Sequence, residues 1–216
     1  MLVLTASSVF AASRFSVASG NWSSTSTWSA TSGGASGASA PIAGDDATIE
    51  GGFTVTLSAN AASANVTVKN ASTVDASTFT LTVSSTFTLQ AGSTFKQGGT
   101  VQTQPGVTRV FDSNSTYIFN GAQTSISAPG NFGNLTWSST ANSSPGTNLT
   151  ITGNLTLLNS LQLRGSTGTT ARTHTVSGNV VIDGASAVLV GTNAAATPTT
   201  GSGTSPEASP PRTAGS

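Results

Sequence analysis

The chain has 216 residues, of which only 6% are charged, and its seven Lys and Arg residues balance its seven Asp and Glu residues. No basic surface is therefore available to neutralise a phosphate backbone or an anionic membrane, which argues against a nucleic-acid partner and against electrostatic membrane binding. The absence of cysteine excludes disulfides, thiolate metal sites and cysteine nucleophiles. Serine and threonine are abundant instead, with 35 and 37 residues, so we expect hydroxyl groups to provide much of the solubility.

The first segment, residues 1–13, is short and apolar and ends in small residues. This pattern is typical of the second half of a secretory signal peptide, with a candidate cleavage site at Val9, Phe10 and Ala11. An apolar first strand is the alternative interpretation. The signal-like pattern predicts a secreted or cell-surface protein. Because the apolar run is too short to span a bilayer, we expect no membrane insertion.

From about residue 48, apolar and hydroxyl residues alternate along the chain. In "GGFTVTL", for example, Phe53, Val55 and Leu57 would leave one side of a strand and the threonines the other. Threonine and valine also suit strands better than helices, and no segment has apolar residues at helical spacing over three turns. The same alternation in later segments predicts further inward-facing residues, namely Val66, Val68, Phe79, Leu81, Val83, Phe87, Leu135, Trp137, Leu149, Ile151, Leu155, Leu157, Leu161, Leu163, Val180 and Ile182.

The predicted strands are short, and the units resemble one another: "GNLT" occurs at 133–136 and 153–156, and "GNVV" at 178–181. A sandwich of hairpins would also be all-β, but Asn-Gly turn dipeptides are nearly absent. Repetition at a short period instead favours a solenoid with coils of about 20–25 residues. We therefore predict an all-β parallel β-helix of about six or seven coils.

The composition divides the predicted solenoid from its flanks. Residues 14–47 contain Trp22 and Trp28 and are expected to form an N-terminal cap over the β-helix at 48–191. Residues 192–216 contain no Leu, Ile, Val or Phe and four of the eight prolines. Such a segment buries too little surface to offset its ordering entropy, so we expect a flexible, disordered tail or linker.

Several of these segments are similar to a known group of proteins. "SGNWSSTSTWS" followed by "AGDDATIEGGFTVTL" resembles the opening of many secreted surface proteins of Bacteroidetes and related bacteria, and "STYIFNGAQTSI", "GNFGNLTW" and "GNLTLLNSLQL" resemble their downstream repeats. The resemblance covers about residues 18–191. It implies a right-handed parallel β-helix that acts as a stalk, an adhesive (adhesin-like) module or a carbohydrate-contacting surface.

Asp45, Asp46 and Glu50 form the one acidic cluster of the sequence. Hard oxygen ligands at this spacing could hold Ca²⁺. The alternative is a solvated turn at the entrance to the first coil, in which one Asp caps backbone amides. The Gly-Gly-x-Gly-x-Asp repeats of calcium-binding β-rolls are absent, and no other cofactor is indicated.

If the chain were an enzyme, the candidate catalytic residues would be Asp75, Asp112 and the single histidine, His174. A β-helix that hydrolyses or eliminates polysaccharides needs paired carboxylates or a basic residue with Ca²⁺, whereas charge here is scarce and dispersed. The Gly-x-Ser-x-Gly elbow of serine hydrolases is also missing. A non-catalytic protein is therefore favoured over a polysaccharide hydrolase or lyase.

The polar residues of the repeats suggest two further roles. In the Asn-Leu-Thr units, an Asn at each coil corner could bond to its counterpart in the next coil. Thr-x-Thr pairs at Thr54/Thr56, Thr80/Thr82 and Thr86/Thr88 raise the alternative of an ice-binding solenoid. We expect a structural or adhesive module whose partners are glycans or other copies of the surface protein.

Overall fold

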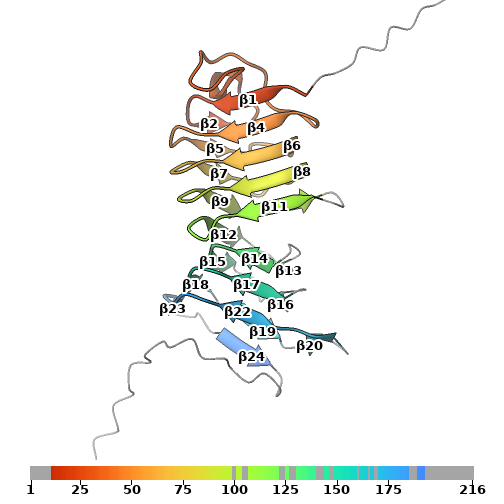
Figure 1. Cartoon of the computed structure of the whole chain (residues 1–216), viewed down its shortest axis with the longest axis vertical. Helices are drawn as coiled ribbons and strands as arrows, with labels where there is room; N and C mark the ends of the chain where they lie inside the picture. The colour runs from red at the N-terminus through yellow and green to blue at the C-terminus, as the bar shows by residue number, and fades with distance from the viewer. Residues whose placement is uncertain are drawn as a thin grey trace, which may run out of the picture.

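The chain forms an elongated all-β solenoid in the computed structural model (Figure 1). The structure describes residues 11–98, 101–103, 107–121, 125–126, 130–139, 144–145, 148–159, 161–164, 166–167, 170–184 and 189–192. Within these ranges, the one helical element is a single 3-10 turn, η1 (Thr25–Thr27). Residues 1–10 of the predicted signal segment and 193–216 of the predicted tail lie outside the described part of the chain.

Two long walls of parallel strands make up most of the solenoid. The first wall contains β1 (Ser13–Ser16), β4 (Asp46–Ile49), β6 (Ala61–Val68), β8 (Leu81–Leu89) and β11 (Thr108–Phe111), and lower down β14 (Gly130–Phe132), β17 (Leu149–Ile151) and β22 (His174–Val176). The second wall is one sheet of eight strands: β2 (Gly20–Asn21), β5 (Thr54–Thr56), β7 (Thr73–Asp75), β9 (Thr94–Gln97), β12 (Thr116–Gly121), β15 (Asn134–Ser139), β18 (Leu155–Leu157) and β23 (Val180–Ile182).

Shorter pairings form a third side. β6 and β8 bend at a register shift between Ser63 and Asn65, so that the first half of β8 pairs with β10 (Val101–Thr103) and its second half with β11. The remaining pairs on this side are β13 (Ser125–Ile126) with β16 (Ser144–Pro145), and β19 (Leu161–Arg164) with β24 (Leu189–Thr192). A small antiparallel hairpin joins β20 (Ser166–Thr167) to β21 (Thr170–Ala171).

The register of the second wall gives the length of each coil. Successive partners run from Thr54 to Thr73, Thr94, Thr116 and Asn134, and then from Leu135 to Leu155 and Val180. These pairs are 19, 21, 22, 18, 20 and 25 residues apart, close to the predicted 20–25. The solenoid has about five turns, fewer than the six or seven coils predicted. The predicted parallel solenoid is thus confirmed.

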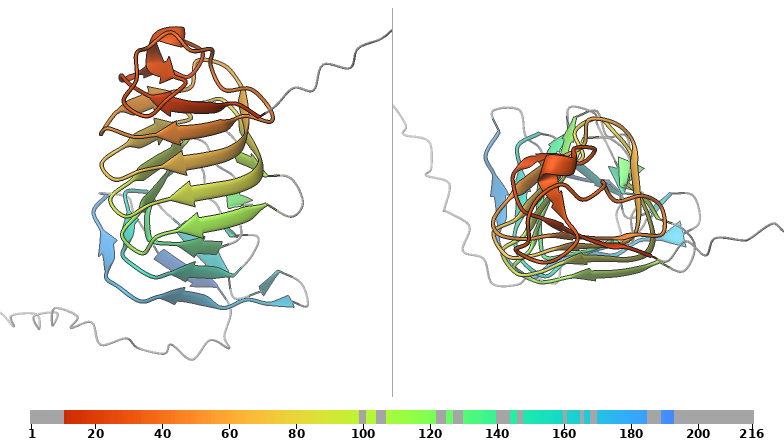
Figure 2. Two further views of the ribbon diagram at one scale, coloured as in Figure 1. Left: turned by 45° about the horizontal axis from the view of Figure 1, so that its top comes forward. Right: turned by 90° about the horizontal axis from the view of Figure 1, so that it is seen from above.

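The sense of winding can be followed in Figure 1, where the front strands β4, β6 and β8 run from right to left while the chain descends. This is a right-handed winding, as strand–crossover–strand connections in one sheet almost always show. The view along the axis in Figure 2 shows the coils superposed around a common interior.

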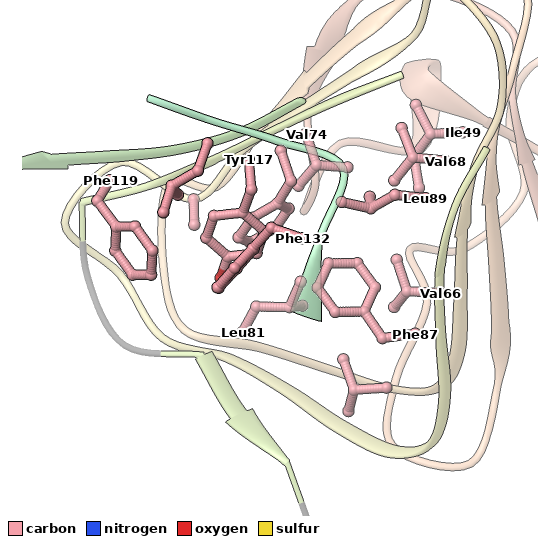
Figure 3. Packing of buried hydrophobic residues seen from close by; sticks show 14 of the residues in the cluster. Ile49, Val66, Val68, Val74, Leu81, Phe87, Leu89, Tyr117, Phe119 and Phe132 are labelled. Atoms are coloured by element: carbon pink, nitrogen blue, oxygen red, sulfur yellow. The ribbon is translucent and has the colours of Figure 1, made fainter. Parts of the chain in front are cut away.

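That interior is filled by the side chains that alternate inward along the walls (Figure 3). Phe87 of the first wall and Phe95 of the second meet edge to face with ring centroids 5.0 Å apart. Tyr117 continues the stack 5.1 Å below Phe95. Most predicted inward residues are buried, namely Val55, Leu57, Val66, Val68, Leu81, Val83, Phe87, Leu135, Trp137, Leu149, Ile151, Leu155 and Leu157. The side chains of Leu161 and Leu163 lie outside the described part.

The prediction that Phe53 faces the interior is wrong, and Phe79, also predicted to be buried, only contacts the core from a corner; both side chains are half-buried. Phe53 precedes β5 at the position that Ser72, Ser93 and Ser115 occupy in the next three coils. Those serines are completely buried, so the corner has room for a small side chain and a phenyl ring must turn outward. Phe79 follows a tight turn and packs against the edge of the core.

Val180 and Ile182 were also predicted to face inward, yet their side chains are 45% and 53% exposed. β23 is the last strand of the eight-stranded sheet. Inward side chains of a solenoid are covered by the coil that follows as well as by the coil that precedes. In the part of the chain that the structure describes, no strand pairs with β23 on its far side, which accounts for the exposure of these two side chains.

The corner between the first and second walls changes its chemistry along the solenoid. In the upper coils it carries a buried Ser followed by an outward Thr, as at Ser93-Thr94, where the Ser93 hydroxyl donates to the Gln90 carbonyl oxygen over 2.6 Å. In the lower coils the same two positions are Gly-Asn, at 133–134, 153–154 and 178–179. A Cβ at Gly133 would lie 2.1 Å from the Asp112 carbonyl oxygen, so this position cannot hold a serine.

The N-terminal segment packs on the first coil. β1 pairs in parallel with β4 and antiparallel with β3 (Trp28–Ser29). Trp22 and Trp28 are buried and meet edge to face at 5.2 Å, and each indole N–H donates to a backbone carbonyl oxygen. The two rings therefore cover the apolar interior at this end.

Candidate binding site at the first corner of the solenoid

One row of polar side chains follows the corner between the first and second walls. The strand register places Ile49, Val68 and Leu89 in line, and the ladder continues one residue further, since the Lys69 and Gln90 amides donate to the carbonyl oxygens of Ile49 and Val68 at 2.8 and 3.0 Å. Glu50, Lys69 and Gln90 therefore stack from one coil to the next at the strand spacing.

Glu50 is held firmly at the top of this row. The Ser16 hydroxyl accepts from the Glu50 backbone N–H at 2.8 Å and donates to its carbonyl oxygen at 3.0 Å. The carboxylate accepts a hydrogen bond from the Ser32 hydroxyl and forms a salt bridge with Lys69 Nζ at 2.7 Å. With only 12% of its side chain exposed, Glu50 is a fixed group, whereas the Lys69 side chain is 41% exposed.

The electrostatics of this pair follow from those contacts. Burial raises the pKa of Glu50, but the hydrogen bonds from Lys69, Ser32 and the Gly33 backbone and the positive charge of Lys69 together outweigh burial, so that the pKa lies below its ordinary value of 4.5. Glu50 is therefore ionised at neutral pH, and the pair carries no net charge.

An open cleft of about 700 Å³ lies around this row, where the cap loop at 32–34 stands beside the first coils. Its lining includes Ser32, Glu50, Phe53, Lys69, Asn70 and Gln90. The half-buried Phe53 ring folds over Gly51, where a Cβ would come within 2.6 Å of ring atom Cε2. Gly51 also has a left-handed φ of 72°. Glycine adopts this conformation without strain, and its lack of a side chain leaves the space that the Phe53 ring occupies beside the cleft.

The three acidic residues that the sequence offered as a possible calcium site make separate contacts in the structure. Asp45 Oδ1 and Oδ2 accept from the backbone amides of Ala12 and Ile42 at 2.9 and 3.2 Å, which is the amide-capping role considered as the alternative. Asp46 Oδ1 accepts from Asn65 Nδ2 at 2.6 Å, and Glu50 pairs with Lys69. Across the described ranges, no three Asp, Glu or His side chains are grouped as a metal site would require.

The three candidate catalytic residues lie on separate elements. Asp75 ends β7, where Oδ1 accepts from the Ser77 amide at 2.8 Å and Oδ2 lies 3.8 Å from Lys96 Nζ. Asp112 follows β11 and caps its own turn through the Asn114 amide at 2.8 Å. His174 Nδ1, on β22, accepts from the Leu149 amide at 3.2 Å. Each side chain thus contacts the backbone of its own turn or of the neighbouring coil.

The three Thr-x-Thr pairs do not form one array. Thr54 and Thr56 lie on β5 of the second wall, Thr82 pairs with Gln102 on the third side, and Thr86 and Thr88 lie in the first wall. A single column of threonines does run down the second wall through Thr54, Thr73, Thr94 and Thr116. The neighbouring column contains Asp75 and Lys96, which interrupts a second row of hydroxyl groups.

Among the residues that line the cleft, the sequence pattern indicated a ligand-binding role for Glu50 alone. Lys69 and Gln90 follow it by 19 and 40 residues and become its neighbours only through the coil register. One sequence feature that Lys69 and Gln90 share with Glu50 could have pointed to them: all three directly follow a strand of alternating apolar residues.

Comparison of the chain with protein-family models, with curated proteins and with solved structures finds no match. Among the described residues, no helix has the length and apolar character needed to cross a membrane.

Proposed function

We propose that this chain is a non-catalytic structural or adhesive module of a secreted or cell-surface protein, one that contacts glycans or other copies of that protein. From the sequence resemblance, we further propose that the chain belongs to an adhesin-like surface protein of the Bacteroidetes type. Residues 14–47 act as its N-terminal cap, 48–191 as the β-helix and 192–216 as a tail or linker.

The observation that carries the proposal is the use made of the six candidate site residues. Asp45, Asp112 and His174 bond to backbone amides, and Asp46 bonds to an amide side chain of the next coil. Glu50 and Asp75 face lysines of the following coils. Side chains that cap turns or connect neighbouring coils stabilise the solenoid, and this role is enough to explain their presence. Catalysis would require several of them to face one substrate together.

A polysaccharide hydrolase or lyase of the same fold is the first alternative function, and an ice-binding solenoid is the second. The threonine column of the second wall favours ice binding, and the neighbouring column, in which Asp75 and Lys96 interrupt a second row of hydroxyl groups, disfavours it. Thermal hysteresis in freezing solutions would support that alternative in place of adhesion.

The test is a binding assay on the purified chain, with insoluble polysaccharides and with a surface coated by the chain itself. We expect weak, multivalent retention that changes little between low and high salt, because the exposed groups are hydroxyls and amides. Failure to bind any polysaccharide or the chain itself would contradict an adhesive role.

A further inference from the structure

We propose that the cleft at the first corner, between the cap loop and the first three coils, binds a neutral sugar unit of a glycan. This inference rests on the proposed function and adds to it a site, a ligand class and the residues that would make contact. Three properties of the cleft carry it: an aromatic ring, exposed amide side chains, and charges that cancel.

The aromatic ring is that of Phe53. Interior phenylalanines of this solenoid, such as Phe87 and Phe95, are at most 1% exposed and packed against other rings. Phe53 differs because the buried corner position admits only a small side chain, and its ring lies over Gly51 in the wall of an open cleft. A pyranose has an apolar C–H face, and covering that face with an aromatic ring removes apolar surface from water.

The amide groups are those of Asn70 and Gln90, whose residues are exposed and line the cleft. An amide side chain offers both a carbonyl acceptor and an N–H₂ donor, which is what neighbouring sugar hydroxyls require. Asn70 Oδ1 lies close to Gly92 of the next coil, where an added Cβ would come within 2.2 Å of it. The cleft thus presents directed hydrogen-bonding groups beside an apolar ring, as ligand sites commonly do.

The charges of the cleft decide between neutral and acidic sugars. Lys69 is the cation that lines it, and its ammonium group is 2.7 Å from the Glu50 carboxylate, which the Ser32 hydroxyl also holds. An acidic sugar would have to compete with a carboxylate that is almost buried and fixed in place. The cleft is therefore suited to a neutral sugar.

The experiment compares binding by titration calorimetry or by ligand-observed NMR. The probes are the neutral tetrasaccharides of β-1,4-linked glucose, β-1,4-linked N-acetylglucosamine and α-1,4-linked glucose, with tetragalacturonate as the acidic counterpart. The variants are Gln90→Ala and Phe53→Leu. Their matched controls are Asn131→Ala, an exposed amide on the first wall, and Phe79→Leu, a half-buried ring at another corner. Circular dichroism and melting temperature verify that each variant is folded.

We expect at least one neutral probe to bind, with its Kd raised about two- to tenfold by Gln90→Ala and raised also by Phe53→Leu, and with the two control variants like the wild type. Binding of a neutral probe that none of the cleft variants weakens would overturn the site while leaving glycan contact in place. Preferential binding of tetragalacturonate, abolished by salt and by Lys69→Met, would overturn the neutral-sugar assignment. Binding of no probe at all would overturn both the site and the glycan part of the proposed function.

Discussion

Asn154 lies directly below Asn134 in the solenoid, and its backbone N–H donates to the Asn134 side-chain oxygen over 2.9 Å. Asn179 makes the same 2.9 Å bond to Asn154 in the following coil, and Asn134 Nδ2 donates upward to the Ser115 carbonyl oxygen at 3.2 Å. These residues form the corner ladder that the Asn-Leu-Thr repeats predicted. Glycines at 133, 153 and 178 take the positions of the buried serines of the upper corners, and the asparagines that follow take those of the outward threonines. A Cβ at Gly153 or Gly178 would lie 2.4 or 2.6 Å from the Oδ1 atom of Asn134 or Asn154.

We therefore expect Asn154→Ala to lower the free energy of unfolding by about 0.5–1.5 kcal/mol, because the Asn179 amide loses its acceptor. Asn154→Asp keeps an acceptor oxygen and should cost less. Urea unfolding measures both, with the exposed Asn131→Ala as control. A loss no larger than that of the control would contradict the ladder.

The interior stack predicts a large effect for one phenylalanine and a smaller one for another. Phe87→Ala removes a ring that contacts both Phe95 and Phe111 at 5.0 and 5.3 Å, and we expect it to cost about 3–5 kcal/mol. Phe53→Ala removes a half-buried ring outside the core and should cost clearly less. Equal melting temperatures for the wild type and Phe87→Ala would contradict the assignment of Phe87 to the interior.

Tyr117 is completely enclosed, and its hydroxyl donates to Gln97 Oε1. Its enclosure raises the pKa of Tyr117 above its ordinary value, so the hydroxyl stays protonated as a donor. Tyr117→Phe keeps the ring but leaves the buried Gln97 oxygen without this bond, and we expect a loss of about 1–3 kcal/mol in urea unfolding. Stability equal to that of the wild type would show that the bond contributes nothing.

Glu50 should make the stability of the fold depend on acid. Its folded-state pKa lies below the ordinary value of 4.5, so ionised Glu50 stabilises the fold above that pH, and the stabilisation is lost as the pH falls through the lower folded-state value. The difference in unfolding free energy between the wild type and Glu50→Gln should therefore be positive at pH 7 and shrink towards pH 3. Parallel pH profiles for the two proteins would contradict the ion pair with Lys69.

The parts of the fold that the sequence predicted are those that depend on alternation alone. Val66, Leu81, Leu135 and Leu155 are inward because a strand has two sides, and each is buried. Repetition of the local sequence is less informative. Ser-Thr-Phe occurs at 77–79, 85–87 and 93–95, yet the three copies occupy different settings: Phe79 lies at a corner, Phe87 in the first wall and Phe95 in the second. Alternation along a strand shows which residues share a side, but it does not show at which residue the chain bends from one wall of the solenoid to the next.

The candidate site was harder to predict for a related reason. Neighbours across coils are 18–25 residues apart, and this number changes from coil to coil, so the partner of Glu50 could not be found by counting. The sequence raised Asp45, Asp46 and Glu50 as a possible calcium site beside a capping turn, and the structure gives the three carboxylates separate contacts with backbone amides, Asn65 and Lys69. Those partners come from other coils or from the cap, so they could not be read from the local sequence.

The most direct test of the proposed non-catalytic role is the release of reducing or unsaturated sugar ends from a panel of polysaccharides, with and without Ca²⁺. The wild type is compared with the triple variant Asp75→Ala, Asp112→Ala, His174→Ala, whose fold is checked by circular dichroism. We predict no release above background by either protein. Turnover by the wild type, above all turnover that the folded triple variant loses, would contradict the account.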